Sequence, residues 1–139
     1  MSHLALPRPV AEELLAHARA ELPNEACGFL SGSLSAGSVL AFHPARNADA
    51  SPLRFSVHAE DLVRLTFAIE RAGQDMVGIF HSHVRAPAVP SPTDLREATH
   101  PDAVHVLATL ADSLAAPERC LRAWRIRDGR AEEVALALV

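Results

Sequence analysis

Apolar side chains recur at helical spacing in two stretches of the first half of the chain, which predicts two amphipathic helices. The first helix begins near Pro9, which fits a first turn, and ends before Pro23, which cannot continue a helix. The second begins with the acids Glu60 and Asp61, which the helix dipole favours in a first turn, and ends at Gly73. The apolar positions are Ala11, Leu14, Leu15, Ala18 and Leu22 in the first helix and Leu62, Leu65, Ile69 and Ala72 in the second.

Most other apolar runs are short and are typical of strands. We expect strands over residues 27–34, 39–45, 53–57, 76–80, 104–110, 121–127 and 131–138. The first two form a hairpin, and Asp128-Gly129 is a strong turn signal between the last two. Ser91 and Pro92 open a short third helix, because serine caps a helix and proline fits its first position. Helices and strands alternate early and strands dominate late, so we expect an α/β protein with one mixed sheet, helices on its faces and a single domain over residues 1–139.

The composition narrows the class of protein. The net charge is -4, whereas a nucleic-acid groove needs a basic surface, so nucleic acid is not an expected partner. No apolar run approaches the ~20 residues of a membrane span, and the stretch from Met1 to Leu6 is too short for a secretory signal. Cys27 and Cys120 do not make a disulfide framework. We expect a cytoplasmic protein with reduced, buried thiols and no membrane contact.

The segment with the clearest chemistry follows the predicted strand at 76–80. It consists of His81-Ser82-His83, seven further residues, Ser91, two residues and Asp94. Side chains alternate along a strand, so His81 and His83 project the same way. The loop is long enough to turn back and bring Asp94 beside them. Two imidazoles and one carboxylate leave a fourth tetrahedral position for water, which is the pattern of a catalytic zinc site.

This run and a second motif upstream resemble the JAMM/MPN+ metalloprotease family. Members of that family carry a His-[Ser/Thr]-His, seven residues, Ser, two residues, Asp run, which stands here as HSHVRAPAVPSPTD. The upstream segment from Pro23 to Gly32, PNEACGFLSG, is similar to the family's Pro-x-Glu-x-Cys-Gly-x-Leu-x-Gly signature. Asn47 and Phe55 also fall where the family tends to have an Asn and an apolar residue. The resemblance covers roughly residues 5 to 110, and Val84 departs from it where many members have Pro.

The resemblance implies a fold and a set of roles. The fold is a cytidine-deaminase-like three-layer α/β fold, with a central mixed sheet flanked by helices. His81, His83 and Asp94 would hold Zn²⁺, and Glu25 would act as the general base on a zinc-activated water. Ser91 would donate a hydrogen bond to the developing oxyanion.

The resemblance also implies a substrate, and alternatives stay open beside it. A compact member of this kind would be a peptidase or isopeptidase that cleaves after the C-terminal Gly-Gly of a small ubiquitin-like or sulfur-carrier protein. Hydrolysis of other small amides would use the same zinc and base. A metal-free binding scaffold is a further alternative, although such relatives usually lose the ligands. A zinc deaminase is set aside, because the Pro-Cys-x-x-Cys motif that completes its zinc site is absent from the sequence.

Several other residues have structural explanations. His105 stands in an apolar run and is predicted to be a satisfied core residue. Gly28 and Gly32 are expected where a strand meets close backbone. The closing hairpin is rich in arginine, which suggests either an edge strand protected by charge or a strip that meets an acidic partner. These arginines are Arg119, Arg122, Arg125, Arg127 and Arg130.

Overall fold

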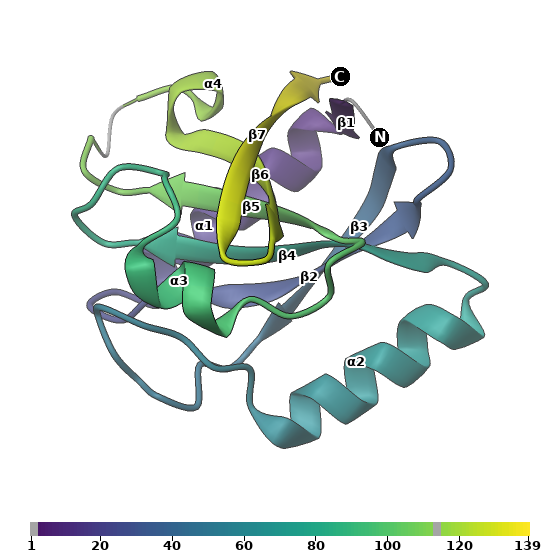
Figure 1. Ribbon diagram of the computed structural model, residues 1–139, viewed down its shortest axis with the longest axis horizontal. Coiled ribbons are helices and arrows are strands. Elements are labelled where there is room, and N and C mark those ends of the chain that lie inside the picture. Colours follow the sequence, from purple (N-terminus) through teal and green to yellow (C-terminus); the bar gives the residue numbers. More distant parts are fainter. Residues whose placement is uncertain (1–2, 113–114) are drawn as a thin grey trace.

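The chain folds around one mixed β-sheet that closes on itself (Figure 1). The computed structural model describes residues 3–112 and 115–139. Its elements are β1 (His3–Leu6), α1 (Arg8–Ala20), β2 (Cys27–Ser33), β3 (Ser38–Ala45), α2 (Ala59–Arg71), β4 (Asp75–His83), α3 (Pro92–Glu97), β5 (Val104–Thr109), α4 (Pro117–Cys120), β6 (Leu121–Arg127) and β7 (Arg130–Leu138). The strand order is β1-β3-β2-β4-β5-β6-β7, and β7 returns to pair with β1. The predicted α/β class with a mixed sheet is thus confirmed, while the cytidine-deaminase-like assignment stays a prediction.

Two elements were not expected from the sequence, and one expected strand is a loop. The strand β1 was not expected, because four residues ahead of a proline carry little periodicity and their partner β7 lies at the other end of the chain. The four-residue helix α4 was likewise too short to predict. The expected strand over 53–57 is wrong: only an isolated bridge joins Asn47 to Val57, and the segment is a loop.

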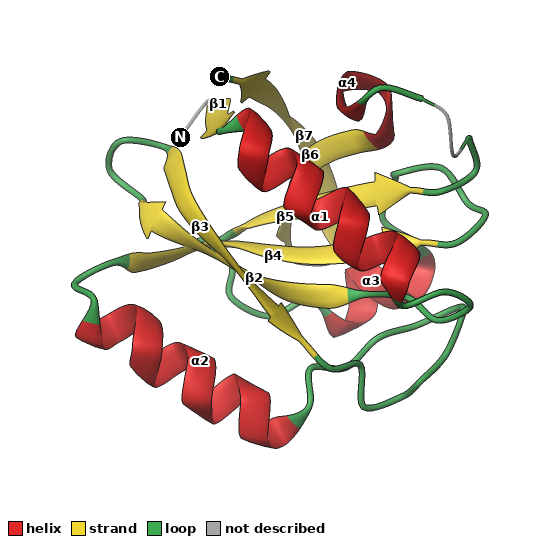
Figure 2. Ribbon diagram, turned by 180° about the vertical axis from the view of Figure 1, so that it is seen from behind, coloured by secondary structure: helices red, strands yellow, loops and turns green. Residues whose placement is uncertain are grey.

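The two long helices cover opposite sides of the strands β2 and β4 (Figure 2). The core on the α1 side contains Leu14 of the helix and Leu30 and Phe80 of the strands. The core on the α2 side contains Leu65 and Ile79. The strands β2 and β4 are therefore buried on both faces, which explains why the run ahead of the histidine motif is continuously apolar.

The register of the sheet sets the place of the histidine motif. In the β2–β4 pairing Cys27 lies opposite His81, so the segment that carries Glu25 ends beside the motif. A β-bulge between Leu30 and Ser31 shifts the register further along the strand. A Cβ at Gly28 would lie 2.5 Å from the carbonyl oxygen of His43, so the close-approach role predicted for this glycine is confirmed.

The closing hairpin is not an edge of the sheet. β7 pairs with β1 in parallel, from His3 opposite Ala135 to Leu6 opposite Leu138. The expectation of an edge strand protected by charge is therefore wrong, because the far N-terminus supplies the missing partner strand. Among the described residues, no helix is long and apolar enough to cross a membrane.

Candidate active site

Three side chains predicted as metal ligands meet at the end of β4. His81 and His83 come from the last residues of that strand, and Asp94 comes from the first turn of α3. Asp94 Oδ2 lies 3.2 Å from His81 Nε2 and 3.1 Å from His83 Nε2. One ligand atom from each residue lies within 4.8 Å of the others, and all three side chains are buried.

Hydrogen bonds fix the orientation of the two imidazoles. His83 Nδ1 lies 2.7 Å from the carbonyl oxygen of Pro87, so this nitrogen is the N–H donor and Nε2 keeps its lone pair. The His81 ring stacks on Phe55, with 4.4 Å between the ring centroids. Burial lowers the pKa of His81, so its ring is a neutral imidazole at pH 7. A neutral imidazole binds a metal through the ring nitrogen that carries no proton.

The first turn of α3 places Asp94 and Ser91 together through a capping box. The Asp94 amide donates to Ser91 Oγ at 3.0 Å, and the Ser91 amide donates to Asp94 Oδ2 at 2.8 Å. Burial opposes ionisation of Asp94, but hydrogen bonds from His81 and His83 lower its pKa below the ordinary range. Ser91 Oγ accepts one bond there and keeps its own O–H proton for another partner.

Glu25 lies beside this cluster with a free carboxylate oxygen. The residue is 3 % exposed, and its Oε1 atom has no hydrogen-bond partner among the described residues. Burial raises the pKa of Glu25 to about 7, against the opposing charge of His83. An unpartnered buried carboxylate with a pKa near neutrality is typical of a general base.

The donor set fits one divalent transition metal. Ligand atoms that share a tetrahedral zinc ion stand about 3.3 Å apart at the usual bond lengths. The two nitrogen-to-Asp94 distances match that separation, and the Pro87 carbonyl holds His83 in the tautomer whose Nε2 can bind a metal. Without a cation, His83 would need protons on both nitrogens to satisfy Pro87 and Asp94 at once.

The tertiary structure adds supporting residues that spacing alone did not reveal. Asn47 Nδ2 donates to the carbonyl oxygen of Glu25 at 3.0 Å, and its Oδ1 accepts from the Ser56 amide at 3.1 Å. Ser82 Oγ accepts from the Ala26 amide at 2.8 Å, on the face of β4 opposite the two histidines. These bonds fasten the Glu25 segment to β4. The family-like position of Asn47 was the one signal that pointed to this support.

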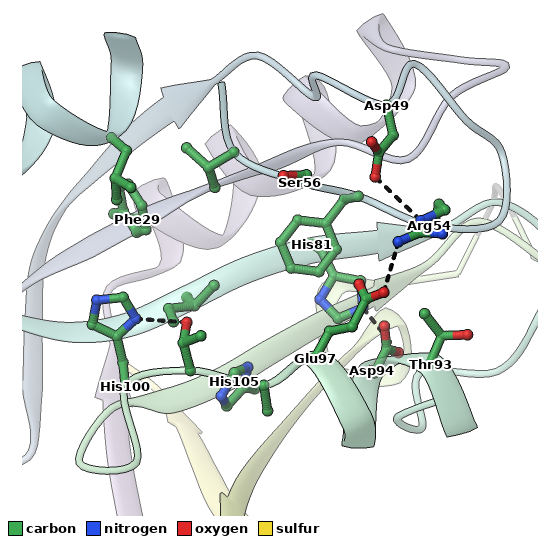
Figure 3. A pocket seen from close by; sticks show the side chains of 16 residues that line it. Phe29, Asp49, Arg54, Ser56, His81, Thr93, Asp94, Glu97, His100 and His105 are labelled. Carbon is green, nitrogen blue, oxygen red and sulfur yellow. Dashed lines mark hydrogen bonds and ion pairs between the residues drawn. The ribbon is translucent and has the colours of Figure 1, made fainter. Parts of the chain in front are cut away.

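Two cavities flank the cluster. The Phe55 cavity, of about 320 Å³, is lined among others by Phe29, Arg54, Phe55, His81, Asp94 and His105 (Figure 3). The Glu25 cavity, of about 580 Å³, is lined among others by Pro23, Glu25, Leu53, His83, Arg85 and Ser91. The predicted ligands are thus divided between two hollows, one on each side.

Two residues discussed from the sequence lie near the site without joining it. Cys27 is fully buried, as expected, and burial raises the pKa of its thiol to about 12, so the thiol is unreactive. His105 is buried as predicted, but its Nε2 has no partner among the described residues. The expectation that this histidine is satisfied is therefore wrong for one of its two ring nitrogens.

Comparison with known proteins agrees with this arrangement. The family model described as prokaryotic homologs of the JAB domain matches residues 7–127. A desampylase of Haloferax volcanii is 37 % identical over 113 residues, which cover 78 % of this chain and 81 % of that protein. A CysO-cysteine peptidase of Mycobacterium tuberculosis is 36 % identical over 131 residues, which cover 94 % and 87 %. The solution structure of a Desulfitobacterium hafniense protein superposes with a TM-score of 0.85 at 33 % identity, covering 98 % of this chain and 92 % of that one.

The chain therefore belongs to the prokaryotic JAB-domain family. The hydrolase class predicted from the motif, a JAMM-type peptidase, is confirmed by these named relatives.

Proposed function

We propose that this protein is a zinc-dependent peptidase that hydrolyses the amide bond after the C-terminal Gly-Gly of a small ubiquitin-like or sulfur-carrier protein. The observation that carries the proposal is the meeting of His81, His83 and Asp94 beside the buried, unpartnered carboxylate of Glu25. A structural metal site needs no adjacent base, whereas amide hydrolysis does.

Each residue has a distinct role in the proposed reaction. His81, His83 and Asp94 would hold the zinc ion, which when bound polarises the scissile carbonyl and acidifies a water molecule. Glu25 takes the proton of the attacking water and passes it to the leaving nitrogen. Ser91 uses its free O–H proton to stabilise the charge that develops on the carbonyl oxygen.

The substrate class rests on the relatives. One is named for removing a small protein modifier and another for cleaving a CysO-cysteine bond. The second name describes hydrolysis of a conjugate between CysO and cysteine. An extended tail of two glycines suits a narrow passage over a buried cluster, since glycine carries no side chain.

The test is a cleavage assay read by intact mass. Small Gly-Gly-ending carrier proteins of the same genome, each extended by cysteine or a short peptide, are mixed with the protein with and without a zinc chelator. We expect loss of the extension after Gly-Gly, and we expect the chelator to stop it. If zinc-loaded protein cleaves no carrier but hydrolyses short peptide amides, the small-amide hydrolase replaces this proposal. Purification without stoichiometric metal would favour the binding scaffold.

A further inference from the structure

A second hollow lies beside the Glu25 cavity. Val84 and Arg85 line both, so the two spaces share a wall. The second hollow, of about 370 Å³, is lined by Arg19, Leu22, Val84, Arg85, Leu110 and Ala111. The two adjacent spaces outline a path from Glu25, along the loop that follows His83, toward the end of α1.

Apart from the groups that take part in the reaction, the charged side chains that line this path are positive. Apart from Glu25, no carboxylate lines either space within the described chain. Arg85 lines both spaces and Arg19 lines the second. Arg85 is exposed and forms no hydrogen bond or ion pair with any described residue. Its guanidinium is thus a free, planar donor at the mouth of a largely apolar cavity.

The loop that carries Arg85 is held in place from both sides. The Leu110 amide donates to the His83 carbonyl at 3.0 Å, and Thr109 Oγ1 donates to the Ala86 carbonyl at 2.7 Å. Trp124 Nε1 donates to the Ala88 carbonyl at 2.9 Å. The backbone of Arg85 lies between these anchors, so the guanidinium starts from a fixed point and loses less freedom when it binds a ligand.

The proposed reaction decides which half of a substrate enters this path. Glu25 must hand its proton to the leaving nitrogen, so that nitrogen lies on the Glu25 side of the cluster. Glu25 lines the cavity that Arg85 borders and does not line the Phe55 cavity. The leaving group therefore extends toward Arg85.

We propose that Arg85 binds the carboxylate of the leaving group and selects substrates in which a carrier is extended by one amino acid or a short peptide with a free C-terminus. Such a leaving group holds a carboxylate within a few bonds of its nitrogen, and guanidinium binds carboxylate through two parallel hydrogen bonds. A carrier joined to a lysine side chain inside a folded protein presents no such carboxylate. This inference rests on the proposed function and narrows its substrate class.

The experiment compares two forms of one substrate. A carrier extended after Gly-Gly by a single alanine is prepared as the free acid and as the C-terminal carboxamide, and kcat/KM is measured for each. We expect wild-type protein to prefer the free acid by about 10- to 100-fold, mainly through KM, as for a hydrogen bond to a charged group. Arg85→Ala should bring this ratio close to one, and Arg85→Lys should keep part of it.

A matched control separates the effect of position from that of total charge. Arg71, at the exposed end of α2, lines none of the three spaces described above. Arg71→Ala should keep the wild-type ratio. Equal cleavage of both forms by wild-type protein, or an unchanged ratio in Arg85→Ala, overturns the inference and leaves the proposed peptidase standing. Failure to cleave either form, by zinc-loaded wild-type protein, overturns the proposed function itself.

Discussion

One arginine lines each of the two cavities beside the histidine–aspartate cluster. The two arginines differ in whether they form ion pairs. Arg54, in the Phe55 cavity, contacts Asp49 at 3.2 Å and Glu97 at 2.6 Å (Figure 3). Arg85, in the Glu25 cavity, has no charged partner among the described residues. The first arginine joins the loop over 47–56 to α3, the helix that carries Asp94. A paired cation of this kind serves the structure, whereas an unpaired one is available to a ligand.

Buried titratable groups with an unpartnered atom line both cavities. Glu25 Oε1 is such an atom in the Glu25 cavity, and His105 Nε2, as well as His81 Nδ1, is one in the Phe55 cavity. Burial disfavours the charged form of both Glu25 and His105, so it raises the pKa of Glu25 to about 7 and lowers the pKa of His105 to about 4. At neutral pH the carboxylate can take up a proton, while the imidazole stays uncharged. The proposed reaction therefore has its proton transfer on the Glu25 side.

The largest effect is expected from Glu25→Gln. The amide keeps the shape of the side chain but cannot accept a proton, so cleavage should fall by about 10²- to 10⁴-fold. Zinc content should stay stoichiometric, because Glu25 is not among the three predicted ligands. Cleavage rate by intact mass and metal content by elemental analysis check both parts. Glu12→Gln, at an exposed position of α1, is the control. Wild-type turnover in Glu25→Gln would show that the base has been wrongly assigned.

A smaller effect, on the pH dependence of stability, is expected from substitution of His105, which lines the Phe55 cavity. Its pKa is lowered from 6.5 to about 4, chiefly by burial, so the folded state binds fewer protons than the unfolded chain between these values. The His105 contribution to stability is therefore complete above about pH 6.5, declines as the pH falls, and levels off below about pH 4. The loss amounts to at most about 3 kcal/mol. His105→Phe removes this titration, so its unfolding free energy should decline less steeply than that of wild-type protein in denaturant titrations across this range. Equal slopes for the two proteins would mean that titration of His105 does not contribute to the pH dependence of the unfolding free energy.

The smallest effect is expected from Arg54→Ala. Its ion pairs are exposed, with half of the Arg54 side chain in solvent, so their loss should cost about 0–1 kcal/mol of unfolding free energy. Because the cation is already paired, the preference for a free-acid leaving group should not change. Thermal unfolding and the free-acid to carboxamide ratio measure the two expectations. A collapse of that ratio in Arg54→Ala would place carboxylate recognition in the Phe55 cavity and erase the contrast with Arg85.

Local sequence signals were sufficient for most elements and for the composition of the site. Periodicity located both long helices to within about two residues, because their apolar stripes are regular. The spacing from His81 to Asp94 pointed to a cluster, and the three ligand atoms do meet. The strand β1 was not predicted, because the strands that pair with it are distant in the chain. The segment over 53–57 was misassigned because Asn47 bonds its backbone as a loop.

The sequence by itself determined which chemistry is available: two imidazoles, two carboxylates and a serine at fixed spacings, in a chain with apolar runs enough to bury them. Only the tertiary structure decided which of these groups lack partners and which spaces they face. Whether Arg54 or Arg85 is paired, or whether His105 is satisfied, depends on residues from distant segments, such as Glu97 beside Arg54. Hydrophobic patterning is a local property and is written along the chain, whereas hydrogen bonding, burial and charge pairing depend on contacts that exist only after the chain has folded.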